Sequence, residues 1–253
     1  MSHRLTRFDF DTMSLPAELI DHIFSFLQED TLALKACSKA HPLLSRLAER
    51  HLFAHIIIDP SRYLRSNVTE ATNPIFENPR FLDYPRTLEI GACLYASRNL
   101  PVISIMSMIP QMTNLISLTI HDPYQTEGFI STLRNCLPQS PFQQLCLSNL
   151  YGFPFSILDD AKNIKQLTLY NCRASDEPIS TSPPSQLSLE TLVLVGRFDP
   201  GLHRWAMRWV TRLTTLELRD LPLDLDRTAF PQLLEACSNS LTRLYLDIGD
   251  YCM

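Results

Sequence analysis

The chain has 253 residues, of which 45% are hydrophobic and 19% charged, so it carries enough apolar side chains to fold around a large core. Its formal net charge of −5 lacks the basic excess that general nucleic-acid binding needs. No apolar run approaches the roughly 18 residues of a membrane-spanning helix. Residues 1–13 lack the apolar segment of a signal peptide and are expected to be disordered. We therefore expect the chain in the cytoplasm, the nucleus or both.

The seven cysteines are expected to be free thiols, because their number is odd and none form a CxxC pair. Neither a cofactor nor a metal is predicted. His51 and His55 have helical spacing but lack the further ligands that zinc needs. Gly196 and Gly201 match half of a phosphate-binding loop, but the Lys and Ser/Thr that should follow are absent.

Residues 14–54 predict three short helices. Pro16 suits the first helical position of one helix, Asp30 can cap the second, and Pro42 can open the third. About forty residues rarely make a self-sufficient core, yet apolar residues occupy more than one face of these helices. The excess must be covered, either by the rest of the chain or by another protein.

This segment also carries a recognisable series of residues. Leu15-Pro16-x-Glu18-Leu19-x-x-x-Ile23-x-x-Phe26-Leu27 is followed by Leu32-x-Leu34 and then by Ala36-Cys37-Ser38. The series resembles an F-box, and the ending Arg50-His51-Leu52-Phe53 is similar to the form common in fungal F-box proteins. Leu44 stands where the family often has tryptophan, so weaker packing is expected there.

The resemblance implies that the segment, assigned to residues 14–58, docks on the Skp adaptor subunit of cullin-based ubiquitin ligases. It places these residues at or under the adaptor interface: Leu15, Pro16, Leu19, Ile23, Leu27, Leu32 and Leu34. The alternatives are an ordinary three-helix start to a larger fold, or a cap on the domain that follows.

From residue 87 to 253 one pattern recurs, L-x-x-L-x-L. The middle leucines of six copies, at positions 118, 145, 167, 192, 216 and 244, are 27, 22, 25, 24 and 28 residues apart. Leucine-rich repeats have periods of about 20–29 residues. Thr87–Ile90 is interpreted as a degenerate first copy.

Amphipathic stretches fall between the copies, at residues 98–109, 126–137, 154–162, 203–211 and 229–238. One strand and one helix per repeat predict an α/β solenoid with a parallel sheet on its concave face and helices on its convex face. Arg204, Arg208 and Arg212 form a basic stripe there, interpreted as a solvated face with a small acidic-partner site as the alternative.

Residues that alternate with the leucines should point off the concave face. They comprise Ser117, Thr119, His121, Gln144, Cys146, Ser148, Gln166, Thr168, Tyr170, Thr191, Val193, Val195, Thr215, Glu217, Arg219, Arg243, Tyr245 and Asp247. Aromatic and arginine side chains supply most interface hot spots. The candidate target-binding residues are therefore Tyr170, Glu217, Arg219, Arg243, Tyr245 and Asp247. The alternative is a merely solvated face.

Residues 59–86 are expected to form a structured connector, since they are rich in proline and apolar residues and not in Gly and Ser. The last repeat is followed by no visible capping repeat. Either a longer natural form or a partner covering that end, including a second copy, is expected.

Three functions follow as hypotheses. The first is a non-enzymatic substrate receptor that joins the Skp adaptor to an unknown target protein. The second is a repeat scaffold whose helices only cap the solenoid. The third is an enzyme with a Cys or His site in the concavity, which requires a thiol of depressed pKa.

Overall fold

The structure is a computed structural model that describes residues 15–58, 78–91, 99–123, 126–175, 188–196, 199–220 and 229–247. The chain divides into two compact units, with the boundary between Ala54 and His55. We describe each unit by itself. The expected disordered segment, residues 1–13, and the first part of the expected connector, residues 59–77, lie outside the described residues.

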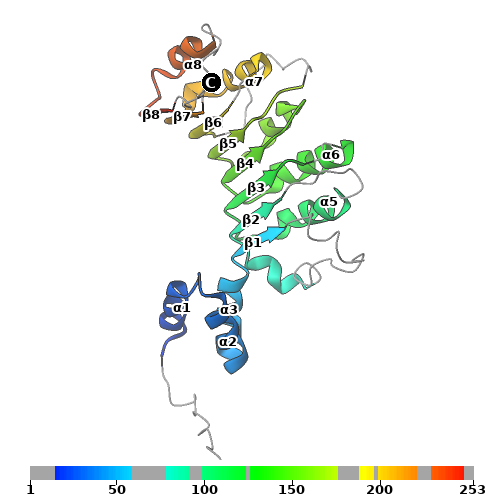
Figure 1. Ribbon diagram of the computed structural model, residues 1–253, viewed down its shortest axis with the longest axis vertical. Helices are drawn as coiled ribbons and strands as arrows, with labels where there is room; N and C mark the ends of the chain where they lie inside the picture. Colours follow the sequence, from blue (N-terminus) through cyan, green and yellow to red (C-terminus); the bar gives the residue numbers. More distant parts are fainter. Residues whose placement is uncertain are drawn as a thin grey trace, which may run out of the picture. The chain divides into compact units, whose positions relative to one another are not determined.

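The first unit consists of three helices, α1 (Ala17–Phe26), α2 (Thr31–Ala40) and α3 (Pro42–Leu52) (Figure 1). As predicted, the Asp30 side chain caps α2 by accepting hydrogen bonds from the N–H groups of Leu32 and Ala33, at 3.1 and 2.9 Å. Pro42 opens α3. Pro16 stands one position before the first helical residue and is the N-cap of α1.

A small core holds this unit together. Its buried residues are Phe24 from α1, Leu34 from α2, and Leu47 and Ala48 from α3. Leu44 packs against this cluster and is partly buried. Its apolar side chain thus contributes to the packing of this unit.

The second unit is an eight-stranded, all-parallel sheet whose strands follow each other in sequence order. The strands are β1 (His55–Ile58), β2 (Thr87–Ile90), β3 (Ser117–His121), β4 (Gln144–Ser148), β5 (Gln166–Tyr170), β6 (Thr191–Val195), β7 (Thr215–Arg219) and β8 (Arg243–Leu246). This α/β, solenoid-like arrangement agrees with the predicted fold class. Seven of the strands lie where the repeat pattern placed them.

Strand β1 corrects one predicted boundary. We assigned residues 55–58 to the helical module, but they pair with β2 and begin the sheet. Ile56 and Ile58 are buried in the core of the sheet unit because they occupy the two inward positions of the repeat. Phe53-x-x-Ile56-x-Ile58 fits the repeat pattern with phenylalanine and isoleucine in the leucine positions, a signal that the repeat prediction missed.

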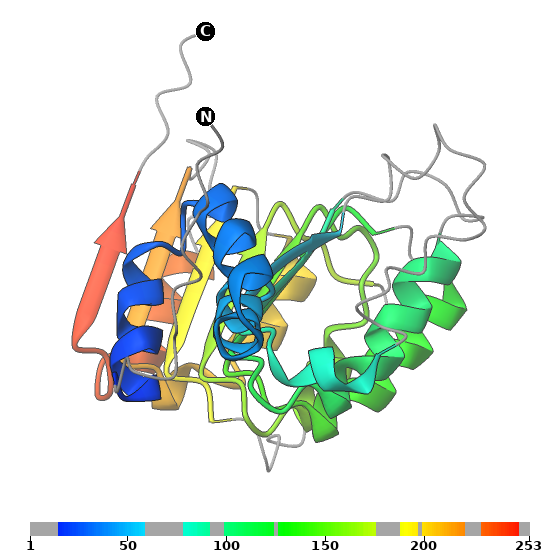
Figure 2. The same ribbon diagram turned by 90° about the horizontal axis from the view of Figure 1, so that it is seen from below.

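Helical segments connect the strands and lie on one face of the sheet. In Figures 1 and 2 the helices α5 (Asn99–Met108) and α6 (Glu127–Cys136) lie side by side there. Further along are α7 (Pro200–Ala206) and α8 (Ala229–Cys237). The stretch at 154–162 forms a 3₁₀ helix, η7 (Phe155–Asp160), and not an α-helix. The β4–β5 repeat has the smallest spacing of the six copies, 22 residues, which leaves little chain for α-helical turns.

Shorter 3₁₀ helices complete the connections. They are η3 (Pro79–Asp83), η5 (Ile109–Gln111), η6 (Leu137–Gln139) and η8 (Val210–Arg212). The described end of the predicted connector is ordered as expected, since Asp83 accepts hydrogen bonds from the side chains of Thr113 and Asn114, at 3.0 and 2.7 Å. These bonds attach η3 to the start of the β3 repeat.

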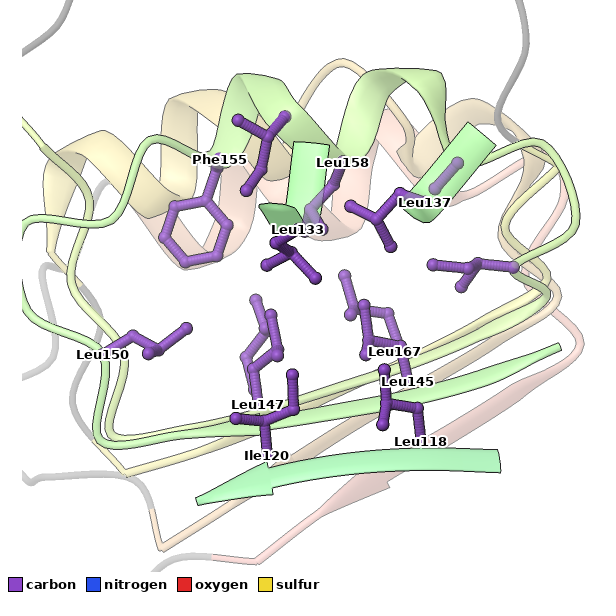
Figure 3. Packing of buried hydrophobic residues seen from close by; sticks show 14 of the residues in the cluster. Leu118, Ile120, Leu133, Leu137, Leu145, Leu147, Leu150, Phe155, Leu158 and Leu167 are labelled. Carbon is purple, nitrogen blue, oxygen red and sulfur yellow. The ribbon is translucent and has the colours of Figure 1, made fainter. Parts of the chain in front are cut away.

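Two columns of apolar side chains run through the sheet core. The strand register places Leu118, Leu145, Leu167, Leu192 and Leu216 in one column, and Ile120, Leu147, Leu169, Leu194 and Leu218 in the other. All of them are buried. Figure 3 shows several of these side chains pointing toward Leu133, Leu137, Phe155 and Leu158 from the helical layer. Burial of a leucine side chain contributes about 1.5–3 kcal/mol.

A residue with positive φ directly follows each strand from β3 to β7. These residues are Asp122, Asn149, Asn171, Gly196 and Asp220, with φ of 43°, 57°, 49°, 88° and 50°. Their left-handed conformation turns the chain out of the sheet, and Asn, Asp and Gly tolerate it best. Gly196 therefore has a structural role, since an added Cβ would lie 2.0 Å from Asn171 Oδ1.

The helical layer contains an aromatic cluster next to a partly buried ion pair. The rings of Phe155 and Trp205 lie 5.2 Å apart, and those of Trp205 and Trp209 lie 6.1 Å apart. Asp159 accepts hydrogen bonds from Arg208 at 2.8 Å and from Trp205 Nε1 at 3.3 Å. Burial raises the pKa of the Asp159 carboxyl, against the lowering effect of Arg208.

The same pair corrects our interpretation of the basic stripe as a solvated face. The Arg208 side chain is only 11% exposed and is neutralised by Asp159. Arg204 and Arg212 are exposed as expected. The stripe is therefore not a continuous basic surface, and the alternative of an acidic-partner site loses its central residue.

Candidate protein-binding surfaces

Helix α1 has apolar side chains on two faces. Ile20, Phe24 and Leu27 face the core of the helical unit. Leu19, Ile23 and Phe26 follow the same helical spacing one position earlier, and they are exposed. We call Leu15, Leu19, Ile23 and Phe26 the α1 stripe, with exposed fractions of 43, 49, 50 and 76%. A soluble helix usually shows a polar outer face, so this stripe marks a candidate protein-binding surface.

Most residues predicted to contact an adaptor are accessible. Leu15, Pro16, Leu19, Ile23 and Leu32 are exposed, Leu32 to 77%. Leu27 is partly buried against the core of the unit.

Leu34, predicted to lie at or under the interface, is 0% exposed and is one of the buried residues of the helical core. It holds α2 in place and presents no side chain to a partner.

Phe26 is a candidate contact residue that we left out of the predicted interface. Its ring packs edge-on against His22, with centroids 5.0 Å apart, and is otherwise largely exposed. The helical spacing from Leu19 through Ile23 to Phe26 was visible in the sequence. Only the structure shows that the face of Phe24, and not that of Phe26, is buried.

The second candidate surface is the sheet face opposite the helices, which we call the open face. Its residues alternate with the core leucines as predicted in β3, β5 and β7. On its β2–β4 side, His121 Nε2 lies 3.3 Å from Glu89 Oε1 and Nδ1 lies 2.9 Å from Ser148 Oγ. These polar side chains therefore hold one another.

Three residues of the predicted open face are buried, and Ser148 is one of them, at 6% exposed. Val193 and Val195 are 5 and 4% exposed, although neither belongs to the main core. The register places Val195 between Tyr170 and Arg219, and Val193 between Thr168 and Glu217. Among these neighbours, Tyr170, Glu217 and Arg219 have longer side chains than valine.

The predicted target-binding residues lie on β5, β7 and β8. Tyr170 and Tyr245 are 42 and 54% exposed. Arg219 is exposed and forms an ion pair with Glu217 on the same strand. Arg243 and Asp247 are exposed as well. The structure thus leaves all six candidates on the open face, with Glu217 partly covered.

A thiol site for catalysis finds no support among four of the cysteines. Burial raises the pKa of Cys136 and of Cys172 to about 11. Burial also raises the pKa of Cys146, with a further contribution from Glu89, and the pKa of Cys237. A nucleophilic thiol needs the opposite shift.

The Ser148–His121–Glu89 arrangement also differs from that of a hydrolase. Ser148 is 6% exposed, so a substrate has little access to its hydroxyl. The next backbone N–H, that of Asn149, already donates to the carbonyl of Tyr170 at 2.7 Å. An oxyanion hole needs donors that are free to bind substrate.

Within the described ranges, no group of three or more His, Cys, Asp or Glu side chains is placed to hold a metal ion. None of the helices described is long and apolar enough to cross a bilayer. No protein-family model matches the chain, and no curated protein matches its sequence. The candidate surfaces are therefore argued from their own geometry.

Proposed function

We propose that this chain is the substrate-recognition subunit of a Skp–cullin–F-box ubiquitin ligase. In this proposal the helical unit is an F-box that binds the Skp adaptor, and the repeats bind a target protein. The observation that carries the proposal is the α1 stripe, because half-exposed leucine and isoleucine side chains lie on the helix whose sequence resembles an F-box.

The size of the helical core supports the same reading. Four residues are buried in it, and Leu32 at the start of α2 is exposed like the α1 stripe. Covering these side chains would remove apolar surface from water at roughly 25 cal/mol per Å². A protein partner of complementary shape would gain that free energy on binding.

In the proposed complex the chain contributes no chemical group. The open face would hold a target through Tyr170, Arg219 and Tyr245. Tethering the target near a ubiquitin-charged enzyme raises the local concentration of its lysines, which accelerates transfer without a catalytic residue here. The proposed compartment is the cytoplasm or the nucleus, where such ligases would act.

Co-expression of the chain with a eukaryotic Skp adaptor tests the proposal. Wild type should elute from gel filtration as a stoichiometric complex with the adaptor. Leu15→Ala/Pro16→Ala should weaken the complex, and Leu19→Asp/Ile23→Asp should abolish it, because both changes alter exposed residues of the helical unit. Ile116→Asp is the matched control, since Ile116 is 47% exposed in the sheet unit.

The repeat-scaffold alternative makes the opposite forecast. If the three helices only cap the repeats, wild type will be soluble and folded but will not bind the adaptor. In that case the ubiquitin ligase proposal is rejected. A complex that Leu19→Asp/Ile23→Asp leaves intact would likewise reject the α1 stripe as its interface.

A further inference from the structure

Strand β8 ends the described sheet with its apolar side chains uncovered. The register aligns Leu244 with Leu216 and Leu246 with Leu218. The β7 leucines are 0 and 1% exposed, whereas Leu244 and Leu246 are 40 and 49% exposed. The two core columns therefore reach the edge of the sheet and stop there uncovered.

The backbone of β8 is also open on that side. The N–H groups of Arg243 and Asp247 donate to Thr214 and Leu218 of the preceding repeat, at 3.0 and 2.8 Å. In a parallel ladder, alternate residues turn their N–H and C=O groups to opposite neighbours. Those of Leu244 and Leu246 consequently point away from β7, and no other described strand pairs with them.

The residues of this edge are complementary to themselves. Residues 243–247 read Arg-Leu-Tyr-Leu-Asp. If a second copy lies antiparallel with Tyr245 opposite Tyr245, Leu244 faces Leu246 and Arg243 faces Asp247. Leucines then meet on the core side of the sheet, and opposite charges meet on the open face. A two-fold axis through Tyr245 makes each contact twice.

This alignment also satisfies the backbone. Leu244 and Leu246, whose polar groups point outward, form the hydrogen-bonded pairs of an antiparallel ladder. Arg243 and Asp247 fall in a non-hydrogen-bonded pair, where Cα atoms are about 4.5 Å apart and side chains are closest. If the two-fold axis passed through Leu244 instead, Thr242 would lie opposite Leu246, and Asp247 would no longer lie opposite Arg243.

We propose that two copies of this chain associate through β8, paired antiparallel about Tyr245. The association extends each sheet across a two-fold axis. Antiparallel edges on parallel sheets are common. Charges on an edge strand can instead serve to prevent pairing, but charges of one sign would do that better than two opposite charges at symmetry-related positions.

Analytical ultracentrifugation of the whole chain at low ionic strength tests the pairing. Wild type should dimerise. Arg243→Asp leaves two acidic residues facing each other at both contacts, and Asp247→Arg leaves two basic ones. Replacing two attractive charge pairs by two repulsive ones should raise the dissociation constant of each variant at least about tenfold. Arg212→Asp, a change at another exposed arginine, should leave it unchanged.

Mixing the two variants sharpens the test. In a heterodimer of Arg243→Asp with Asp247→Arg, both contacts again join opposite charges, so an equimolar mixture should dimerise like wild type. The double variant Arg243→Asp/Asp247→Arg should also dimerise. Leu244→Asp/Leu246→Asp should be monomeric, with an unchanged circular dichroism spectrum because both side chains are exposed at the edge.

Three results would overturn the proposal. Wild type could remain monomeric over the whole accessible concentration range. Its dimer could resist both single charge reversals, or the mixture could fail to restore what the single variants lose. Adaptor binding uses residues of α1 and α2, so its presence or absence is measured separately from this association.

Discussion

In the helical unit, α1 leaves half of the Leu19 and Ile23 side chains exposed, whereas Leu167 and its neighbours in the sheet unit are 0–1% exposed. Both sets read as regular apolar patterns in the sequence. From β3 to β7 the leucine columns are covered by the neighbouring strands and by the helical layer, so the pattern stabilises the fold. In the short helical unit there are too few elements to cover both faces of α1, so part of the pattern remains available to a partner.

The largest expected effect is on the free energy of unfolding, and it distinguishes the buried leucines of the sheet from the α1 stripe. Leu167→Ala removes a fully buried side chain and should lower the free energy of unfolding by about 2–5 kcal/mol. Leu19→Ala should lower it by less than about 1 kcal/mol. Urea denaturation followed by circular dichroism measures both. Equal losses would mean that the α1 stripe is part of a folded core.

The next effect concerns the backbone of the repeats. Gly196→Ala places a Cβ 2.0 Å from Asn171 Oδ1 at a φ of 88°, and should cost about 2–3 kcal/mol. Gly152→Ala is the matched control. Gly152 also has positive φ, 71°, but nothing lies within 4 Å of its added Cβ, so about 1 kcal/mol is expected. A similar loss in both variants would show that the contact with Asn171 relaxes freely.

The smallest expected effect is the loss of folding stability when one of two side-chain pairs is disrupted. Arg208→Met leaves the Asp159 carboxylate without its charged partner in a partly buried site, and should cost about 1–2 kcal/mol at neutral pH. Asp21→Asn weakens the pair with His51, 3.0 Å away in the helical unit, where Asp21 is 44% exposed. That change should cost less than about 0.5 kcal/mol.

The loss of stability caused by Arg208→Met should depend on pH. Burial already raises the pKa of Asp159 in the folded state, and losing Arg208 removes a lowering influence and raises that pKa further. A raised folded pKa favours the protonated native state as the pH falls through it. The difference between wild type and Arg208→Met should therefore shrink on acidification. A constant difference from neutral to acidic pH would argue that Arg208 acts through packing alone.

Much of the sheet unit followed from its sequence. The L-x-x-L-x-L period set the positions of seven strands and assigned the leucines to the core, because side chains alternate along a strand and identical repeats stack in register. β1 was missed because its pattern positions hold Phe53, Ile56 and Ile58 in place of leucine. The 3₁₀ conformation of η7 was missed because it depends on how much chain separates β4 from β5.

The sequence by itself determined the three helices, their caps and the stacking of parallel strands, because local spacing and turn chemistry act over a few residues. Only the tertiary structure decided which of two apolar faces of α1 is buried, that Leu34 belongs to the core, and that Val193 and Val195 are buried. It also brought Asp159 to Arg208 and left Leu244 and Leu246 uncovered. These outcomes depend on contacts between distant segments, and residue spacing along one element carries no information about what lies against it.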